Sequence, residues 1–176
     1  METARLVVAR AWDGAAVDAG ERVVVAVAVD DAAMVIEVDA PFFGDAPPPH
    51  PPGPTPALWS HEVVELFVLG PGDRYTEVEL GPGGHHLVLQ LAGRRQVVAS
   101  ALPIAFSAVV EGGRWRGRAV LDAGLLPPRP WRVNAYAIHG AGAARAYRAA
   151  FAVPGAAPDF HRLDCFTAWD VVQSPQ

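Results

Sequence analysis

The sequence contains no lysine, and its 14 basic residues are all arginine. The missing lysine excludes Schiff-base catalysis, a P-loop phosphate site and lysine as a haem ligand. The single cysteine, Cys165, excludes an internal disulfide and any zinc or iron–sulfur site that needs several cysteines. A net charge of −5 provides no basic field that would attract nucleic acid or an acidic membrane, so neither is expected as a partner.

Long hydrophobic runs are also absent. The longest, Val23–Val29, has seven residues, whereas a helix that crosses a bilayer needs about 20. No extended apolar segment typical of a signal peptide follows the first residues, so a cytoplasmic protein is expected. The 176 residues, half of them hydrophobic, suit one domain with a single core. We expect this domain to span residues 1–172, with a frayed tail at 173–176.

The apolar segments that are present are short, rich in β-branched residues and separated by turns containing Gly, Pro or Asp. This pattern predicts roughly ten strands. The expected groups are the hairpins 23–30 with 34–39, 105–110 with 115–121 and 131–139 with 146–153, and an antiparallel meander of 61–69, 75–80 and 85–91. The only helical signal is one turn near 121–126, which two prolines end. The sequence therefore predicts an all-β antiparallel sandwich with very little helix.

Residues 46–57 differ from the rest of the chain, because seven of the twelve are proline. Proline lacks the N–H group that an internal strand needs, so the segment is expected to be a surface loop with polyproline character. A weaker hypothesis makes it the ligand of a proline-recognition module.

One face of the expected meander is acidic. Side-chain alternation places Glu65, Tyr75, Glu77 and Glu79 together on that face, and it places Glu62 at the end of the opposite, core-facing row. Three neighbouring carboxylates repel one another unless a positive group or water compensates them. Such a face is either an ordinary exposed surface or a ligand-binding face.

The candidates that would compensate these glutamates are Arg94 and Arg95 in the turn after 85–91, Arg132, or a bound cation. A calcium ion near His86 is left open, although the six histidines form no His-x-His or HExxH motif. Cys165 is expected to be a buried, inert thiol, and no serine lies in a G-x-S-x-G context.

The chain also resembles a known family. Trp-Ser-His-Glu-Val-Val-Glu-Leu-Phe at 59–67, followed by Tyr-Thr-Glu-Val-Glu-Leu-Gly-Pro-Gly-Gly at 75–84, resembles a run found in family-nine carbohydrate-binding modules and in the wider DOMON-like group of β-sandwiches. Trp-Arg-Val-Asn at 131–134 and the segment 158–166 are similar to two further parts of that pattern.

A small family of stand-alone DOMON-like proteins is more similar still, over the stretch from Leu58 to Phe166. The shared motifs include Ala-Gly-Arg-Arg at 92–95 and Asn-Ala-Tyr-Ala-Ile-His-Gly at 134–140. The resemblance implies a jelly-roll-type sandwich. It disfavours haem, because haem-binding DOMON-like modules use Met with His or Lys, and Met34 is the only internal methionine.

The function that these observations favour is a non-catalytic module that binds a small polar ligand, above all a carbohydrate, on one face of the sandwich, with no cofactor beyond the calcium ion left open. Carboxylates would accept hydroxyl groups, and an aromatic ring would stack on the sugar. The alternatives are an enzyme that uses Glu65 and Glu77 on a carbohydrate-like metabolite, and a protein-interaction module. The metal and the oligomeric state are left unknown. The candidate ligand-binding residues are Trp59, Glu62, Glu65, Tyr75, Glu77, Glu79, Arg94, Asn134, His139, Tyr147 and His161.

Overall fold

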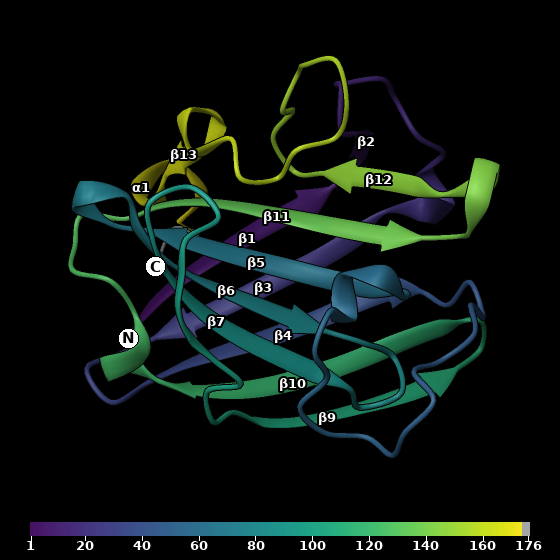
Figure 1. Cartoon of the computed structure of the whole chain (residues 1–176), viewed down its shortest axis with the longest axis horizontal. Helices are drawn as coiled ribbons and strands as arrows, with labels where there is room; N and C mark the ends of the chain where they lie inside the picture. The colour runs from purple at the N-terminus through teal and green to yellow at the C-terminus, as the bar shows by residue number, and fades with distance from the viewer. Residues whose placement is uncertain (174–176) are drawn as a thin grey trace.

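Two antiparallel sheets pack face to face in the computed structural model of the chain, which describes residues 1–173 (Figure 1). The five-stranded sheet has the order β1 (Glu2–Val8), β3 (Val23–Val29), β4 (Ala33–Pro41), β10 (Arg114–Asp122) and β9 (Ala105–Glu111). The eight-stranded sheet has the order β2 (Arg10–Ala11), β12 (Ala146–Ala149), β11 (Arg132–His139), β5 (Val63–Leu69), β6 (Arg74–Leu80), β7 (His86–Ala92) and β8 (Val97–Ser100), and β13 (Thr167–Ala168) pairs with β11.

Helical structure is confined to short segments in residues 1–173. The α-helix α1 (Trp169–Val172) is one turn long, and the 3-10 turns are η1 (Ala19–Glu21), η2 (Leu58–Ser60), η3 (Pro71–Asp73), η4 (Ala123–Leu125), η5 (Gly142–Ala144) and η6 (Leu163–Cys165). No helix in this part of the chain is long and apolar enough to cross a membrane.

The predicted all-β sandwich is confirmed, and so are the predicted strand pairs. β3 pairs with β4, β9 with β10, and β11 with β12, while β5, β6 and β7 form the predicted meander. The turn between β3 and β4 follows from its sequence, because the Asp30 carboxylate accepts hydrogen bonds from the backbone N–H groups of Ala32 and Ala33. The single predicted helical turn is η4.

The main core lies between the sheets. Strand β3 buries every second residue, from Val23 to Val29, against the inner face of β5, where Val64, Leu66 and Val68 point inward as predicted. Trp115 on β10 is also fully buried there. Burial of each such apolar side chain contributes about 1.5–3 kcal/mol relative to exposure, so this alternation is sufficient to position the two sheets.

A second apolar cluster lies on the outer face of the eight-stranded sheet. Phe67 on β5 contacts the rings of Tyr136 on β11 and of Phe166, with centroid distances of 5.2 and 5.9 Å. Phe160 stacks on Tyr136 at 3.9 Å. The segment after β12 therefore packs on this face, and its yellow-green ribbon runs along the β11–β12 side of the sheet (Figure 1).

This packing corrects one interpretation of the acidic face. An exposed surface is wrong, because β5 is buried along its whole length on both sides. Alternation identifies the residues that share a face, but it carries no information about a distant segment that folds over that face.

The proline-rich segment 46–57 is a loop, as predicted, and backbone contacts fix it to β7. Thr55 N donates to His86 O at 2.8 Å, and His86 N donates to Gly53 O at 3.0 Å. At the C-terminal end, Gln173 forms an isolated bridge with Ala4, so the first residue of the expected frayed tail is paired. The rest of that tail, residues 174–176, lies outside the described residues.

Candidate functional site

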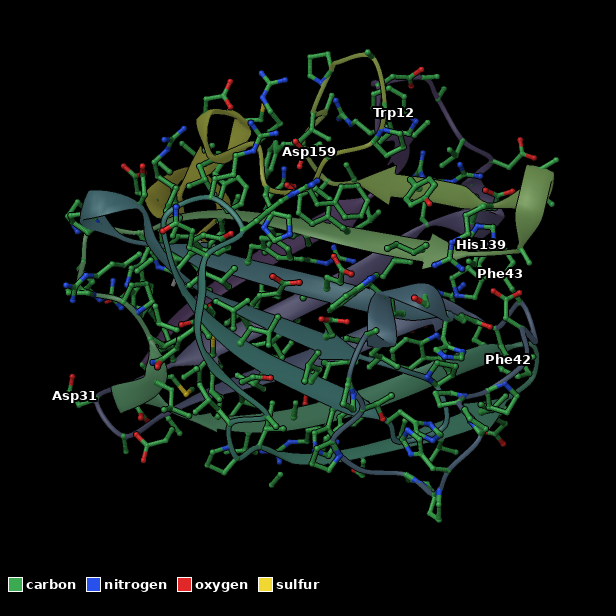
Figure 2. The ribbon with its side chains drawn as sticks, in the orientation of Figure 1. Trp12, Asp31, Phe42, Phe43, His139 and Asp159 are labelled. Atoms are coloured by element: carbon green, nitrogen blue, oxygen red, sulfur yellow. The ribbon has the colours of Figure 1, made fainter. Side chains whose placement is uncertain are left out.

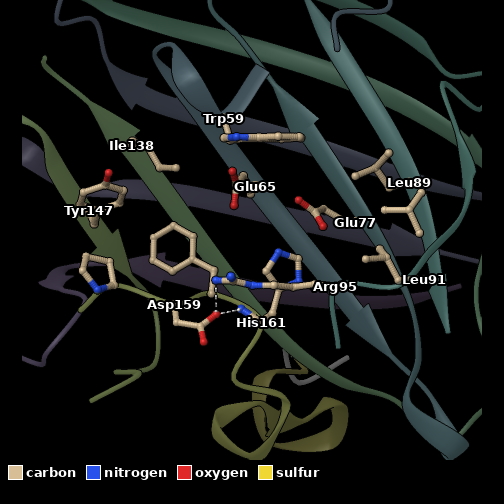
Figure 3. Close-up of a pocket in the computed structure, with 13 residues that line it drawn as sticks. Trp59, Glu65, Glu77, Leu89, Leu91, Arg95, Ile138, Tyr147, Asp159 and His161 are labelled. Atoms are coloured by element: carbon tan, nitrogen blue, oxygen red, sulfur yellow. Dashed lines mark hydrogen bonds and ion pairs between the residues drawn. The ribbon is translucent and has the colours of Figure 1, made fainter. Parts of the chain in front are cut away.

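The outer face of the eight-stranded sheet contains a pocket of about 400 Å³ (Figure 3). Strands β5, β6 and β7 form its floor, and η2, the β7–β8 turn, β12 and the C-terminal segment surround it. The lining residues are Trp59, Glu65, Glu77, Leu89, Leu91, Arg95, Val97, Ile138, Tyr147, Pro158, Asp159, Phe160 and His161. Pockets of this size are typical of small-molecule sites.

The floor carries two buried glutamates, Glu65 and Glu77, and a third, Glu79, lies beside them. Glu65 lies directly opposite Glu79 in the β5–β6 register, and Glu77 is the next residue on the same face of β6. Their exposed fractions are 2%, 0% and 3%, respectively. Within residues 1–173, Oε2 of Glu77 is buried without a hydrogen-bond partner, whereas the buried carboxyl group of Glu79 lies beside that of Glu77 and the backbone N–H of Trp59. None of the three glutamates forms a salt bridge in this part of the chain. Buried carboxyl groups without partners are costly in a structural role.

Burial and mutual repulsion change the charge of this group. Burial raises the pKa of Glu77 to about 8. Burial first, and then the charges of Glu65 and Glu77, raise the pKa of Glu79 to about 10. The pKa of Glu65 also lies well above its usual range, because of burial and then the charge of Glu77. At neutral pH the carboxyl groups of Glu77 and Glu79 therefore retain protons, and they can donate as well as accept hydrogen bonds.

One wall of the pocket is aromatic. Trp59 is 46% exposed, although it is a large aromatic residue. Its position is fixed through the backbone of η2, because Arg145 donates to Trp59 O, to Ser60 O at 3.1 Å and to Gly140 O at 2.9 Å. Tyr147 on β12 forms the neighbouring part of the wall. Figure 3 shows both rings beside the space into which the glutamates point.

The opposite wall is a polar network around His161. Arg95 N donates to Tyr75 Oη at 3.0 Å, and Tyr75 Oη lies 2.7 Å from His161 Nδ1. The tyrosine hydroxyl therefore donates its own hydrogen to Nδ1, which leaves Nε2 as the protonated nitrogen. Burial, and then the charges of Arg95 and Arg94, lower the pKa of His161 to about 4, so the imidazole is neutral at pH 7.

Several of the predicted residues come together in this pocket. Trp59, Glu65, Glu77, Tyr147 and His161 line it directly. Two further predicted residues adjoin it: Tyr75 contacts His161, and Glu79 lies opposite Glu65.

Three other predicted residues have structural contacts elsewhere. The carboxylate of Glu62 accepts hydrogen bonds from three successive backbone N–H groups, those of residues 43–45, at 3.0–3.2 Å. The Asn134 side chain bonds the backbone N–H and C=O of Phe151. His139 stacks on Phe43 with ring centroids 3.5 Å apart, and Figure 2 shows this pair well away from Asp159. None of the three lines the pocket.

The expectation that Arg94 and Arg95 compensate the glutamates is wrong. Both guanidinium groups bind the carboxylate of Asp159, Arg95 at 2.9 Å. Arg132 donates to the carbonyl oxygens of Asp164 and Phe166. Arg94 and Arg95 lie in the turn next to the acidic strands, but Asp159 reaches them from a segment 64 residues further along the chain.

Other pocket residues were also missed by sequence reasoning. Leu89 and Leu91 lie on the outer face of β7 and Ile138 on that of β11, and their alternation was a usable signal. Asp159 and Phe160 belong to the segment 158–166, which was noted only for its family resemblance. No pattern within that segment indicates that it covers the sheet.

A metal centre and a reactive thiol receive no support from the geometry. Within residues 1–173, no group of three or more His, Cys, Asp or Glu side chains is arranged to hold a metal ion. Cys165 is partly exposed rather than buried, and burial followed by the Asp164 charge raises the pKa of its thiol. A raised thiol pKa lowers the fraction of the nucleophilic thiolate.

Comparison with other sequences gives close relatives. No family model matches the chain. The chain is 41% identical over 164 residues to the UPF0462 protein C4orf33 homolog of Danio rerio, a match that covers 88% of this chain and 83% of the relative. Identity to the Mus musculus homolog is 43% over 164 residues, with 88% and 85% coverage. Identity to the Homo sapiens UPF0462 protein C4orf33 is 39% over 168 residues, with 90% and 84% coverage.

Comparison with solved structures supports the sandwich fold. A Bacteroides uniformis protein described as a candidate carbohydrate-binding protein superposes with a TM-score of 0.71 at 15% identity, over 96% of this chain and 85% of that one. A family-nine carbohydrate-binding module of Caldicellulosiruptor kristjanssonii, in complex with glucose, has a TM-score of 0.52 at 12% identity, over 73% and 66%. Identities this low establish a shared fold alone. The DOMON-like grouping stays a prediction.

Proposed function

The chain belongs to the UPF0462 family, and we propose that it is a non-catalytic binding protein for a small carbohydrate, which occupies the pocket on the outer face of the eight-stranded sheet. One observation carries this proposal. The buried carboxyl group of Glu77, whose Oε2 has no hydrogen-bond partner within the described residues, faces a pocket whose wall holds an exposed indole ring. Hydroxyl groups of a sugar satisfy the carboxyl groups, and its C–H face packs on the indole.

The roles of the lining residues follow from their hydrogen-bonding capacity. Protonated Glu77 offers one donor and further acceptor sites to neighbouring hydroxyl groups, and Glu65 offers its carboxyl oxygens beside it. His161 offers the N–H of Nε2 from the opposite wall, since its Nδ1 is occupied by Tyr75. Leu89 and Leu91 exclude water from the remaining wall. The described functions of the two structural neighbours, carbohydrate binding in one and a glucose complex in the other, support the same ligand class.

Isothermal titration calorimetry with glucose and other monosaccharides at millimolar concentration tests this proposal. We expect saturable binding by the wild-type chain and its loss in Trp59→Ala, because the variant removes the stacking surface without opening a core cavity. Phe42→Ala is a matched control: Phe42 is also exposed, at 39%, and does not line this pocket. Binding that survives Trp59→Ala but is lost in Phe42→Ala contradicts the assignment of the pocket.

A second candidate is hydrolysis of a carbohydrate-like substrate by Glu65 and Glu77. The observation that favours it is the presence of two carboxyl groups on one pocket floor, both with raised pKa, since a general acid must hold its proton near neutral pH. A panel of aryl glycosides separates the two candidates. Turnover that disappears in Glu77→Gln supports an enzyme, whereas saccharide binding with no turnover supports the binding protein.

A further inference from the structure

The floor of the pocket holds an excess of acidic groups over basic ones. Glu65, Glu77 and Glu79 are each at least 97% buried, and none of them has an arginine or histidine partner within residues 1–173. Without a basic partner these carboxyl groups stay uncharged by holding their protons. A neutral hydroxyl group leaves them in that state, whereas a cationic group allows one of them to ionise and form a charge-assisted hydrogen bond. We infer that the ligand carries a positively charged amino group, as an amino sugar does, and that this group binds against Glu65 and Glu77. This inference rests on the proposed function.

The nearby arginines do not replace such a ligand. The Arg95 guanidinium lines the pocket, but it binds Asp159, which it shares with Arg94. Arg145 is close enough to lower the pKa of Glu65 slightly, but its Nη1 and Nη2 donate to three backbone carbonyl groups. These arginines therefore leave the carboxyl groups of the floor available to a cationic ligand. The titratable and charged groups around the floor of the pocket come from five parts of the chain. They are Glu65 of β5; Tyr75, Glu77 and Glu79 of β6; Arg94 and Arg95 of the β7–β8 turn; Arg145 and Tyr147 at β12; and Asp159 and His161 of the C-terminal segment.

The walls suit an organic cation. The indole of Trp59 presents a π surface beside the carboxyl groups of Glu65 and Glu77, and Tyr147 lies farther along the same wall (Figure 3). Aromatic faces attract ammonium groups, and the attraction increases where water is excluded. Leu89, Leu91 and Ile138 supply that exclusion and also suit the carbon skeleton of a sugar.

Binding of a cation has a consequence that binding of a neutral sugar lacks. In the free protein the pKa of Glu77, about 8, keeps this carboxyl group largely protonated at pH 7. An ammonium group beside it favours the carboxylate, so the proton is released as the ligand binds. Affinity for the amino sugar therefore rises with pH between 6 and 7, by up to about tenfold per unit for one released proton, whereas affinity for a neutral sugar does not.

Calorimetry at pH 7 with glucosamine, glucose and N-acetylglucosamine tests the inference, since only the first carries an ammonium group. Titration in two buffers of different ionisation enthalpy measures the protons released. We expect glucosamine to bind at least about tenfold more tightly than either neutral sugar, because a charge-assisted hydrogen bond is stronger than a neutral one. We also expect its binding to release about one proton. If glucose binds as tightly as glucosamine and the two sugars release the same number of protons, the inference is overturned and the proposed function stands. If none of the three sugars binds, both are overturned.

Glu77→Gln isolates the charge from the shape. Glutamine has nearly the shape of a protonated glutamate, so the variant is expected to fold. It should abolish both the proton release and the preference for glucosamine over glucose, each compared with glucose in the same variant. Glu37→Gln removes an acid that is largely exposed on the other sheet, and it should change neither. A glucosamine preference that persists in Glu77→Gln contradicts the placement of the amino group.

Discussion

Replacement of Glu79 by glutamine is expected to stabilise the protein, by an amount that increases with pH. Glu79 is fully buried, and its pKa of about 10 lies far above the ordinary value of 4.5. The folded state therefore keeps a proton that the unfolded chain loses above pH 4.5, and stability falls by about 1.4 kcal/mol for each pH unit above that value. At pH 7 the accumulated cost is about 3 kcal/mol. Glutamine fills the same space without this cost.

Urea denaturation of the wild type and of Glu79→Gln at pH 5, 7 and 8 measures this difference directly. The free energies of unfolding should differ by less than about 1 kcal/mol at pH 5 and by about 3 and 4–5 kcal/mol at pH 7 and 8. Glu37→Gln, on the exposed side of β4, should follow the wild type at every pH. A difference between Glu79→Gln and the wild type that stays constant from pH 5 to 8 would refute the claim that Glu79 is protonated in the folded state.

Three further predictions concern other parts of the molecule. Glu62→Gln should lower the free energy of unfolding in urea by about 1.5–3 kcal/mol, because the amide nitrogen cannot accept the backbone N–H groups that the carboxylate binds. An unchanged value would mean that these bonds contribute nothing. Gly140→Ala should lower the melting temperature more than Gly142→Ala: both residues have positive φ, but only at Gly140 would a Cβ atom lie 2.3 Å from a backbone oxygen, that of Ala144. Equal losses in the two variants would contradict this. Finally, His161 should titrate near pH 4 in NMR spectra, and stability should decline as the pH falls from 6.5 towards 4, since the unfolded chain takes up this proton first; titration near pH 6.5 would exclude the buried, neutral imidazole.

The fold could be predicted from the sequence because its determinants are local. Alternating valines in 23–29 specify a strand with one buried face, and the two aspartates after it specify a turn. Each predicted pair is short in sequence separation, so strand pattern and turn chemistry were sufficient. The order of the five-stranded sheet, where β4 lies next to β10, depends on packing between distant segments and was not predicted.

The site could be predicted in part, for a related reason. Alternation grouped Glu65, Glu77 and Glu79 correctly, since residues two apart on neighbouring strands share a face. Burial of that face was missed, because it depends on Phe160 and its neighbours, which return from the far end of the chain. The same segment supplies Asp159, whose carboxylate binds the arginines that were expected to neutralise the glutamates.

Two-dimensional NMR of the tryptophan indole N–H groups during titration with a monosaccharide tests the central claim most directly, because the five tryptophans occupy distinct sites. Among the described residues Trp59 is the tryptophan that lines the pocket, whereas Trp12 packs against the outer apolar cluster and Trp115, Trp131 and Trp169 are buried in the main core. The account predicts a saturable shift of the Trp59 indole signal, with the signals of the three core tryptophans unchanged. If the saccharide binds but shifts the indole signal of another tryptophan and leaves that of Trp59 unchanged, the placement of the saccharide in this pocket is contradicted.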